Sequence, residues 1–145
     1  MIFIKPWDQA FDIAYPVRRA VFVLEQGVPE EMELDEFDPF AQHALSYEGP
    51  ICTGTARLVY LEDNCAQIGR MAVLSQYRGR GIGTAILEAL LDLAQSQEIR
   101  SLSLHSQVTA IPFYEKRGFI AQGPVYEEAG IPHRNMILLL PKMVQ

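Results

Sequence analysis

The residues best suited to do chemistry lie in a short turn in the middle of the chain. The turn reads Arg78, Gly79, Arg80, Gly81, Ile82, Gly83 and Thr84. Apolar residues then recur at three- and four-residue spacing up to Leu93, which predicts a helix that begins in the turn. A helix N-terminus offers unpaired backbone N–H groups and a positive dipole end, and glycine lets a ligand come close. With two arginines added, the turn is suited to hold an anion such as phosphate.

Two common phosphate-binding motifs are absent from this turn. The GxxxxGK[ST] pattern of nucleoside triphosphatases is not matched, because no lysine follows a suitably spaced glycine pair. Gly79, Gly81 and Gly83 run GxGxG rather than GxGxxG, and the segments before them are typical of hairpins, so the dinucleotide fingerprint is missing too. Two interpretations stay open: a phosphate site of another kind, or a tight turn whose glycines only permit the fold. The two arginines favour the first.

The elements around the turn predict an α/β domain, in the broad sense that includes α+β. Strands are predicted at residues 2–6, 66–74, 101–106, 119–128 and 132–140, and two more within 43–61 around the Gly49-Pro50 turn. Helices are predicted near residues 11–22, with Pro16 close to a helix start, at 82–93, and at 110–118. Early strands follow one another as hairpins and later ones are separated by helices, which indicates a mixed sheet.

Length and charge limit the classes of protein. The chain has 145 residues, 49% of them apolar, and a net charge of −6. One domain spanning 1–145 is expected. The acidic charge argues against nucleic acid as a partner. Cys52 and Cys65 lack metal-ligand spacing, so no metal site is expected. The N-terminus lacks a signal-peptide pattern and no apolar run could span a bilayer, which predicts a cytoplasmic protein without membrane contact.

Two sequence blocks resemble the GCN5-related N-acetyltransferase (GNAT) family. The turn, RGRGIG, matches the family motif [QR]xxGx[GA], and it is preceded by the strand GRMAVL. Downstream, LSLHSQVTAIPFYEKRGF at residues 102–119 is similar to the second family block. The segment at residues 21–38 and the late GIPHRNM resemble the ElaA-type branch in particular. The resemblance implies a single domain with a central, mixed, mostly antiparallel twisted sheet that is flanked by helices.

The resemblance also implies acetyl-coenzyme A as cosubstrate and a primary amine, on a small molecule or a peptide, as acceptor. Backbone groups of Met71, Ala72 and Val73 would bind the acetyl and pantetheine portions, and the turn at residues 78–84 would bind the pyrophosphate. Gln107 stands where many family members have Asn, and we place it among the residues that contact the cosubstrate.

Acyl transfer to an amine needs a base for the amine, stabilisation of the oxyanion and a proton for the leaving thiolate. A backbone N–H near Val73 could stabilise the oxyanion. Tyr114 matches the family tyrosine near the coenzyme A sulfur, and the resemblance therefore predicts that it is the general acid. Without the resemblance, the pattern around Tyr114 would predict an aromatic residue of the core. For the base, His133 and Glu25 are rival candidates.

The acidic stretch at residues 25–38 also has two interpretations. It is either a solvated loop or a set of carboxylates that draws a cationic amine towards the acceptor site. Two alternatives to an enzyme are a non-catalytic domain that binds or senses acyl-coenzyme A, and an interaction domain without cofactor. The apolar run MILLL at residues 136–140 fits either a central strand or the contact of a homodimer.

Overall fold

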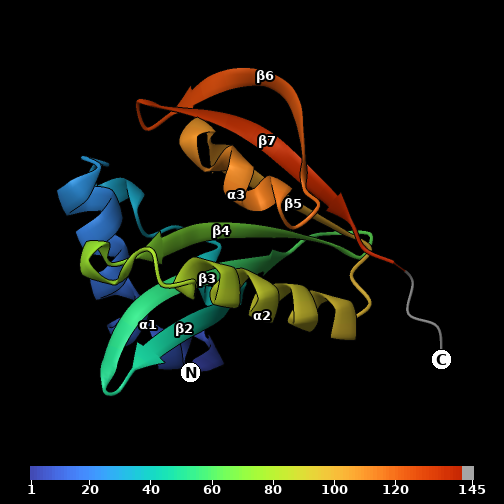
Figure 1. Ribbon diagram of the computed structural model, residues 1–145. Coiled ribbons are helices and arrows are strands. Elements are labelled where there is room, and N and C mark those ends of the chain that lie inside the picture. Colours follow the sequence, from blue (N-terminus) through green and yellow to red (C-terminus); the bar gives the residue numbers. More distant parts are fainter. Residues whose placement is uncertain (142–145) are drawn as a thin grey trace.

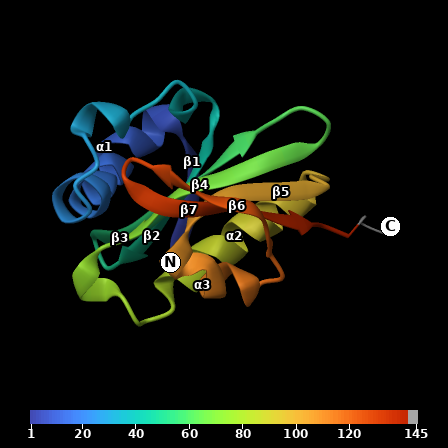
Figure 2. The ribbon, with the colours of Figure 1, turned by 90° about the horizontal axis from the view of Figure 1, so that it is seen from above.

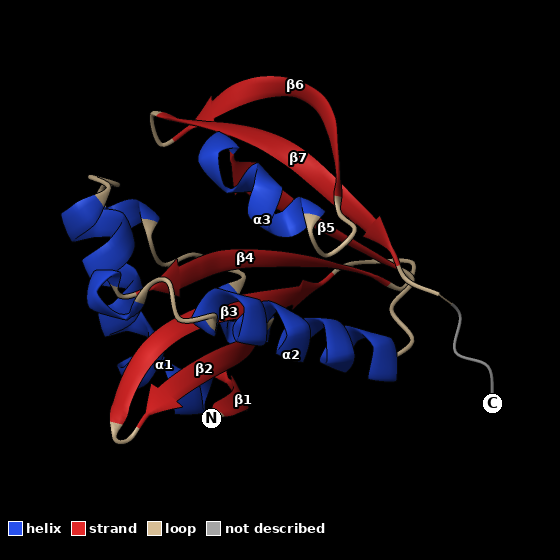
Figure 3. Ribbon diagram, viewed as in Figure 1, coloured by secondary structure: helices blue, strands red, loops and turns tan. Residues whose placement is uncertain are grey.

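Seven strands form one mixed sheet in the order β1-β2-β3-β4-β5-β7-β6, with helices on both faces (Figure 1 and Figure 3). The computed structural model describes residues 1–141. The strands are β1 (Ile2–Pro6), β2 (Gln42–Glu48), β3 (Ile51–Tyr60), β4 (Cys65–Val73), β5 (Ser101–Gln107), β6 (Ile120–Glu128) and β7 (Ile131–Leu139). The helices are α1 (Trp7–Arg18), α2 (Ile82–Ser96) and α3 (Ile111–Glu115). The predicted fold class is confirmed, and so are the predicted strands.

Helices α1 and α2 pack on opposite faces of the same strands, as the view from above shows (Figure 2). Successive side chains of a strand point to opposite faces. On β2, Ala44 therefore joins the core beneath α2, whereas the neighbouring Leu45 packs against Ala10 and Ala14 of α1. Helix α3 adds Tyr114 to the same core that α2 covers. The helices thus enclose the central strands from both sides.

Strands β4 and β5 are parallel neighbours only over part of their length. They pair from Cys65 with Ser101 to Ile68 with Leu104, and α2 is the crossover between them. Beyond Ile68, within the part of the chain that the structure describes, β4 pairs with β3 alone and β5 pairs with β7 alone. The two strands therefore diverge towards their carboxyl ends and leave space between them.

A β-bulge lies on β4 at the start of this divergence. Thr55 of β3 is opposite Ala72, but Arg57, two residues further on, is opposite Gly69, so β4 carries one extra residue. Arg70 lies in the bulge with φ of +54°, in the left-handed region that an ordinary residue seldom adopts. The bulge bends β4 just beyond Ile68, the last residue of β4 that pairs with β5.

Two expectations for the helix near residues 11–22 are wrong in detail. Pro16 lies near the end of α1 and not at its start, and the chain continues after α1 as a π-helical turn at Arg19–Glu25. A proline removes one backbone donor, so the regular bonding pattern changes after it. Phe11 and Tyr15 stack on each other outside the core, and the buried face of α1 carries Ala10, Ala14, Val17 and Arg18.

The segment after α1 is more ordered than a solvated loop. It includes short 3-10 helices at Glu30–Met32 and Asp38–Phe40, and the side chains of Glu33 and Asp38 are buried. The run at residues 136–140 belongs mainly to β7, an internal strand between β5 and β6. None of the helices in residues 1–141 is long and apolar enough to cross a membrane.

Candidate functional site

The glycine-rich turn begins helix α2 and presents an open backbone. Gly79 and Gly81 have φ of +79° and +78°, and a Cβ added to either glycine would meet no atom within 4 Å. Gly81 is the N-cap residue of α2, and within residues 1–141 no side chain hydrogen-bonds the first N–H groups of the helix. The first turn also lacks an acidic residue. These N–H groups and the helix dipole together form a surface that attracts anions.

Among the other residues of the turn, Arg78 and Arg80 carry positive charge, and Gly83 packs against a neighbouring helix. Arg78 donates from Nε to the carbonyl of Val73 at 2.9 Å. Arg80 lies over the ring of Tyr77, with 5.3 Å between its guanidinium carbon and the ring centroid. Gly83 faces the ring of Phe113 on α3, and a Cβ at Gly83 would be 3.4 Å from that ring. Small size at Gly83 thus allows α2 and α3 to approach each other.

Ile82 and Thr84 complete the turn. Both side chains are half-buried, and Ile82 packs against the core beneath α2. The three predicted residues of β4 lie just before the turn. Ala72 is buried, and Met71 and Val73 are half-buried. Ala72 and Val73 pair with Thr55 and Gly54 of β3, Met71 follows Arg70 in the bulge, and none of the three pairs with β5 as far as the structure describes the chain.

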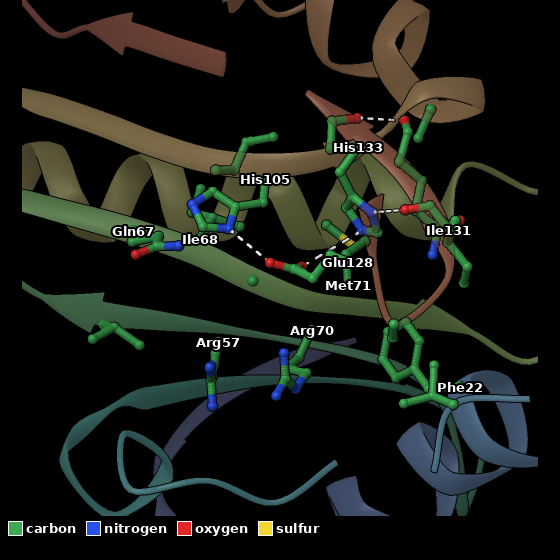
Figure 4. A pocket seen from close by; sticks show the side chains of 18 of the residues that line it. Phe22, Arg57, Gln67, Ile68, Arg70, Met71, His105, Glu128, Ile131 and His133 are labelled. Carbon is green, nitrogen blue, oxygen red and sulfur yellow. Dashed lines mark hydrogen bonds and ion pairs between the residues drawn. The ribbon is translucent and has the colours of Figure 1, made fainter. Parts of the chain in front are cut away.

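A cavity of about 590 Å³ occupies the space between the diverging ends of β4 and β5 (Figure 4). Its walls come from β3, β4, β5, α3, the hairpin of β6 and β7, and the segment at residues 22–37. Four of the predicted site residues line it: Met71, Gln107, Tyr114 and His133. The structure does not bring Glu25 to its wall.

Tyr114 lines this cavity and is buried. Its ring packs edge-on against Phe113 and Phe119, with centroids 4.9 and 5.9 Å away. Burial raises the pKa of the Tyr114 phenol to about 12, because water no longer stabilises the phenolate. The phenol therefore keeps its proton throughout the neutral range and can donate a hydrogen bond or a proton there.

His133 and Gln107 are opposite each other on β7 and β5. The Nδ1 atom of His133 is 2.7 Å from the carbonyl oxygen of Ile131. Since a carbonyl only accepts, Nδ1 must carry the hydrogen and donate, and the lone pair of the neutral ring is on Nε2. Gln107 donates from Nε2 to the side-chain oxygen of Gln26 at 2.8 Å, which ties β5 to the segment after α1.

A buried network of arginines and carboxylates, absent from our predictions, supports the opposite wall of the cavity. Arg18 bonds Glu33 at 2.6 Å and Asp38 at 2.8 Å. Arg57 bonds Asp38 at 2.8 Å and Asp35 at 2.6 Å. Arg70 reaches Asp35 at 3.1 Å from its position in the bulge. The network fixes the acidic segment against β3 and β4.

Glu128 is a second residue that the sequence analysis missed. It ends β6 and lines the cavity, with its carboxylate 3.3 Å from Nδ1 of His105 and 3.7 Å from Nε2 of His133. The segment GIPHRNM drew attention to His133, but nothing in the sequence indicated that the hairpin would place Glu128 between two histidines. Within residues 1–141, no group of three or more His, Cys, Asp or Glu residues is arranged to hold a metal ion.

A comparison with protein families identifies the family of this chain. The family model described as an acetyltransferase (GNAT) domain matches residues 12–140. The chain belongs to the GNAT family. It is similar to the uncharacterized N-acetyltransferase YjcF of Bacillus subtilis (strain 168), with 35% identity over 125 residues that cover 86% of this chain and 89% of YjcF. The family membership and this relative support an acyltransferase.

The predicted resemblance to the ElaA-type branch is also confirmed. ElaA of Escherichia coli (strain K12) is 31% identical over 124 residues, which cover 83% of this chain and 81% of ElaA. The crystal structure of Escherichia coli ElaA superposes with a TM-score of 0.86 over 94% of this chain and 98% of ElaA. An acyl-CoA N-acyltransferase from Pseudomonas aeruginosa gives 0.85 over 94% of this chain and 97% of its own, at 26% identity.

Proposed function

We propose that this GNAT protein transfers the acetyl group of acetyl-coenzyme A to a primary amine by direct attack in a ternary complex. One observation carries the proposal: strand β4 joins the anion-attracting turn to the cavity. Arg78 of the turn bonds the carbonyl of Val73, and Met71, two residues before Val73, lines the cavity. A ligand with a phosphate group at one end and a reactive group at the other could therefore lie along β4.

The residues present fit the cosubstrate. The uncapped N–H groups of α2 and the guanidinium groups of Arg78 and Arg80 would hold the pyrophosphate, as the open space beside Gly79 and Gly81 permits. Backbone groups of Met71 to Val73 would hold the acyl arm, because the edge of β4 that faces β5 has no strand partner there within residues 1–141. Gln107 would contact the arm from β5. When bound, acetyl-coenzyme A supplies an activated carbonyl for the amine to attack.

Tyr114 and His133 take the two proton-transfer roles in this proposal. Tyr114 keeps its proton at neutral pH and donates to the sulfur as negative charge develops there. His133 lines the same cavity and has the lone pair of its neutral ring on Nε2, which can accept a proton from the amine. Glu25 is the weaker candidate for the base, because both of its carboxylate oxygens bond Arg78.

Release of free thiol tests the proposal against a domain that only binds acyl-coenzyme A. The protein is mixed with acetyl-coenzyme A and a panel of primary amines, and thiol is measured over time. The proposal predicts amine-dependent release, while binding without release would support the sensing domain. An interaction domain without cofactor predicts no thermal shift, whereas a ligand at one hundred times its Kd stabilises the fold by about 2.7 kcal/mol.

A further inference from the structure

The charges on the β3 and β4 side of the cavity cancel one another. Arg57, Arg70, Glu33 and Asp35 line this side, and Arg18 and Asp38 lie directly behind them. These are three guanidinium groups and three carboxylates, and every carboxylate in the set bonds at least one guanidinium. This wall therefore carries little net charge.

Glu128 faces this wall from the other side of the cavity, as Figure 4 shows. Of the carboxylates that line the cavity in residues 1–141, it alone has no arginine or lysine partner. Its nearest ionisable neighbours are the imidazoles of His105 and His133. Among the arginines and carboxylates of the cavity, Glu128 therefore supplies the one negative charge that no guanidinium balances.

The backbone holds Glu128 in place at the tip of the β6–β7 hairpin. Ala129 and Gly130 form a two-residue turn with φ of +52° and +76°, the pattern of a type I′ turn. The turn pairs Glu128 with Ile131, whose carbonyl receives the Nδ1 hydrogen of His133. One tight turn thus orients both the carboxylate and the imidazole towards the same space.

We propose that Glu128 binds the ammonium form of the acceptor and that His133 takes the proton which the ammonium must lose before attack. The acceptor class that fits is a cationic amine with no carboxylate beside the reacting nitrogen. Such a carboxylate would lie near Glu128 and repel it, while Arg57 and Arg70 are already neutralised by Glu33, Asp35 and Asp38. This inference rests on the proposed acetyl transfer and adds the identity of its acceptor.

Matched pairs of amines test this assignment. Each pair is an amino acid whose one primary amine is the α-amine and its decarboxylated form: tyrosine and tyramine, histidine and histamine, arginine and agmatine. Thiol release from acetyl-coenzyme A gives kcat/KM for every compound. We expect the decarboxylated member to react faster by about tenfold or more in the pairs that react, since like charges at close range oppose binding.

Two variants identify the residue responsible. Glu128→Gln should lower kcat/KM for the preferred amines about fivefold, mainly through KM, because an exposed carboxylate is partly screened by water. Glu127→Gln is the control, because Glu127 is adjacent on β6, exposed and absent from the cavity wall. It should leave all rates unchanged.

Three results would overturn the assignment: faster reaction of the amino acids, unchanged kinetics in Glu128→Gln, or no reaction with any of the amines in a protein that binds acetyl-coenzyme A. The last result would contradict the acceptor assignment but not the assignment of the acetyl-coenzyme A site. Failure to bind acetyl-coenzyme A at all would contradict the proposed function itself.

Discussion

Arg78 and Glu25 form an ion pair with two parallel hydrogen bonds. Nη1 of Arg78 is 2.7 Å from Oε2 of Glu25, and Nη2 is 2.8 Å from Oε1. The hydrogen bonds from Arg78 hold the pKa of the Glu25 carboxyl below its usual value, even though partial burial acts to raise it. A carboxylate that binds its proton more weakly is a poorer base. The pair thus links the end of the π-helical turn to the first arginine of the glycine-rich turn.

Glu25→Gln separates a pairing role from a catalytic one. We expect kcat to stay within about threefold, and Kd for coenzyme A to fall by a similar factor, because the substitution removes a negative charge beside the pyrophosphate site and frees Arg78. Steady-state kinetics and titration calorimetry measure the two effects. A fall in kcat of about 100-fold at saturating acetyl-coenzyme A would instead make Glu25 the general base.

Tyr114→Phe tests the proton donor. We expect kcat to fall about 100-fold, with little change in Kd for coenzyme A, since only the hydroxyl is lost. With a pKa of about 12, the phenol of the native protein keeps its proton up to pH about 10. Rates measured up to that pH should therefore show no loss of activity from ionisation of Tyr114. If the variant retains nearly full kcat, Tyr114 is not the proton donor and contributes only to packing.

His133→Gln tests the base. The variant keeps a polar side chain on β7 but cannot take up a proton near neutral pH, so kcat should fall about 100-fold while KM for acetyl-coenzyme A changes little. His105→Gln is the comparison, because His105 contacts Glu128 from the other side. It should alter the acceptor KM more than kcat. Equal kcat for native protein and His133→Gln would exclude His133 as the base.

Asp38→Asn tests the buried network. The variant leaves Arg18 and Arg57 short of a charged partner in a dry environment, and we expect a loss of about 3 kcal/mol in the free energy of unfolding at neutral pH. Asp92→Asn, on the exposed side of α2, should change it by less than about 0.5 kcal/mol. Urea unfolding measures both. Equal stability of the two variants would contradict a structural role for the network.

The same residue predicts a dependence of stability on pH. Burial alone would raise the pKa of Asp38, but hydrogen bonds and charges from Arg18 and Arg57 outweigh it and lower the pKa. A carboxyl with a lowered native pKa stabilises the fold above its unfolded pKa of about 3.9 and loses that contribution as pH falls through the native value. Native protein should therefore lose stability more steeply than Asp38→Asn below pH about 4.

Local patterns were enough to predict most elements of the fold. Alternation and turn residues located the strands, including the hairpin at Gly49-Pro50, and apolar spacing located α2. The three- and four-residue spacing from Ile82 to Leu93 includes Ala85 and omits Leu87, whereas in the structure Leu87 is buried and Ala85 is exposed. Such errors arise because helical spacing gives a broad stripe, while the neighbouring strands decide which side chains become fully covered.

The missing parts of the site depend on contacts between distant residues. Arg18 meets Glu33 and Asp38, and Arg57 meets Asp35, across 15 to 22 positions of the sequence. No periodicity predicts such a network. One signal was available: Arg18 occupies a position on the buried side of α1, where a charge requires a partner. Glu128 gave no comparable signal, because its role depends on how the hairpin returns towards β5.

The most direct test of the account is the affinity for coenzyme A after Gly81→Asp. Aspartate tolerates the left-handed conformation better than most residues and is a good N-cap, so α2 should form. Its carboxylate would bond the N–H groups assigned to the pyrophosphate and repel that group. Gly123→Asp, at a φ of +76° on β6 with similar open space, is the control. Titration calorimetry should show a Kd raised about 100-fold for Gly81→Asp and unchanged for the control. A folded Gly81→Asp protein that binds coenzyme A like the native protein would contradict the assignment of the turn.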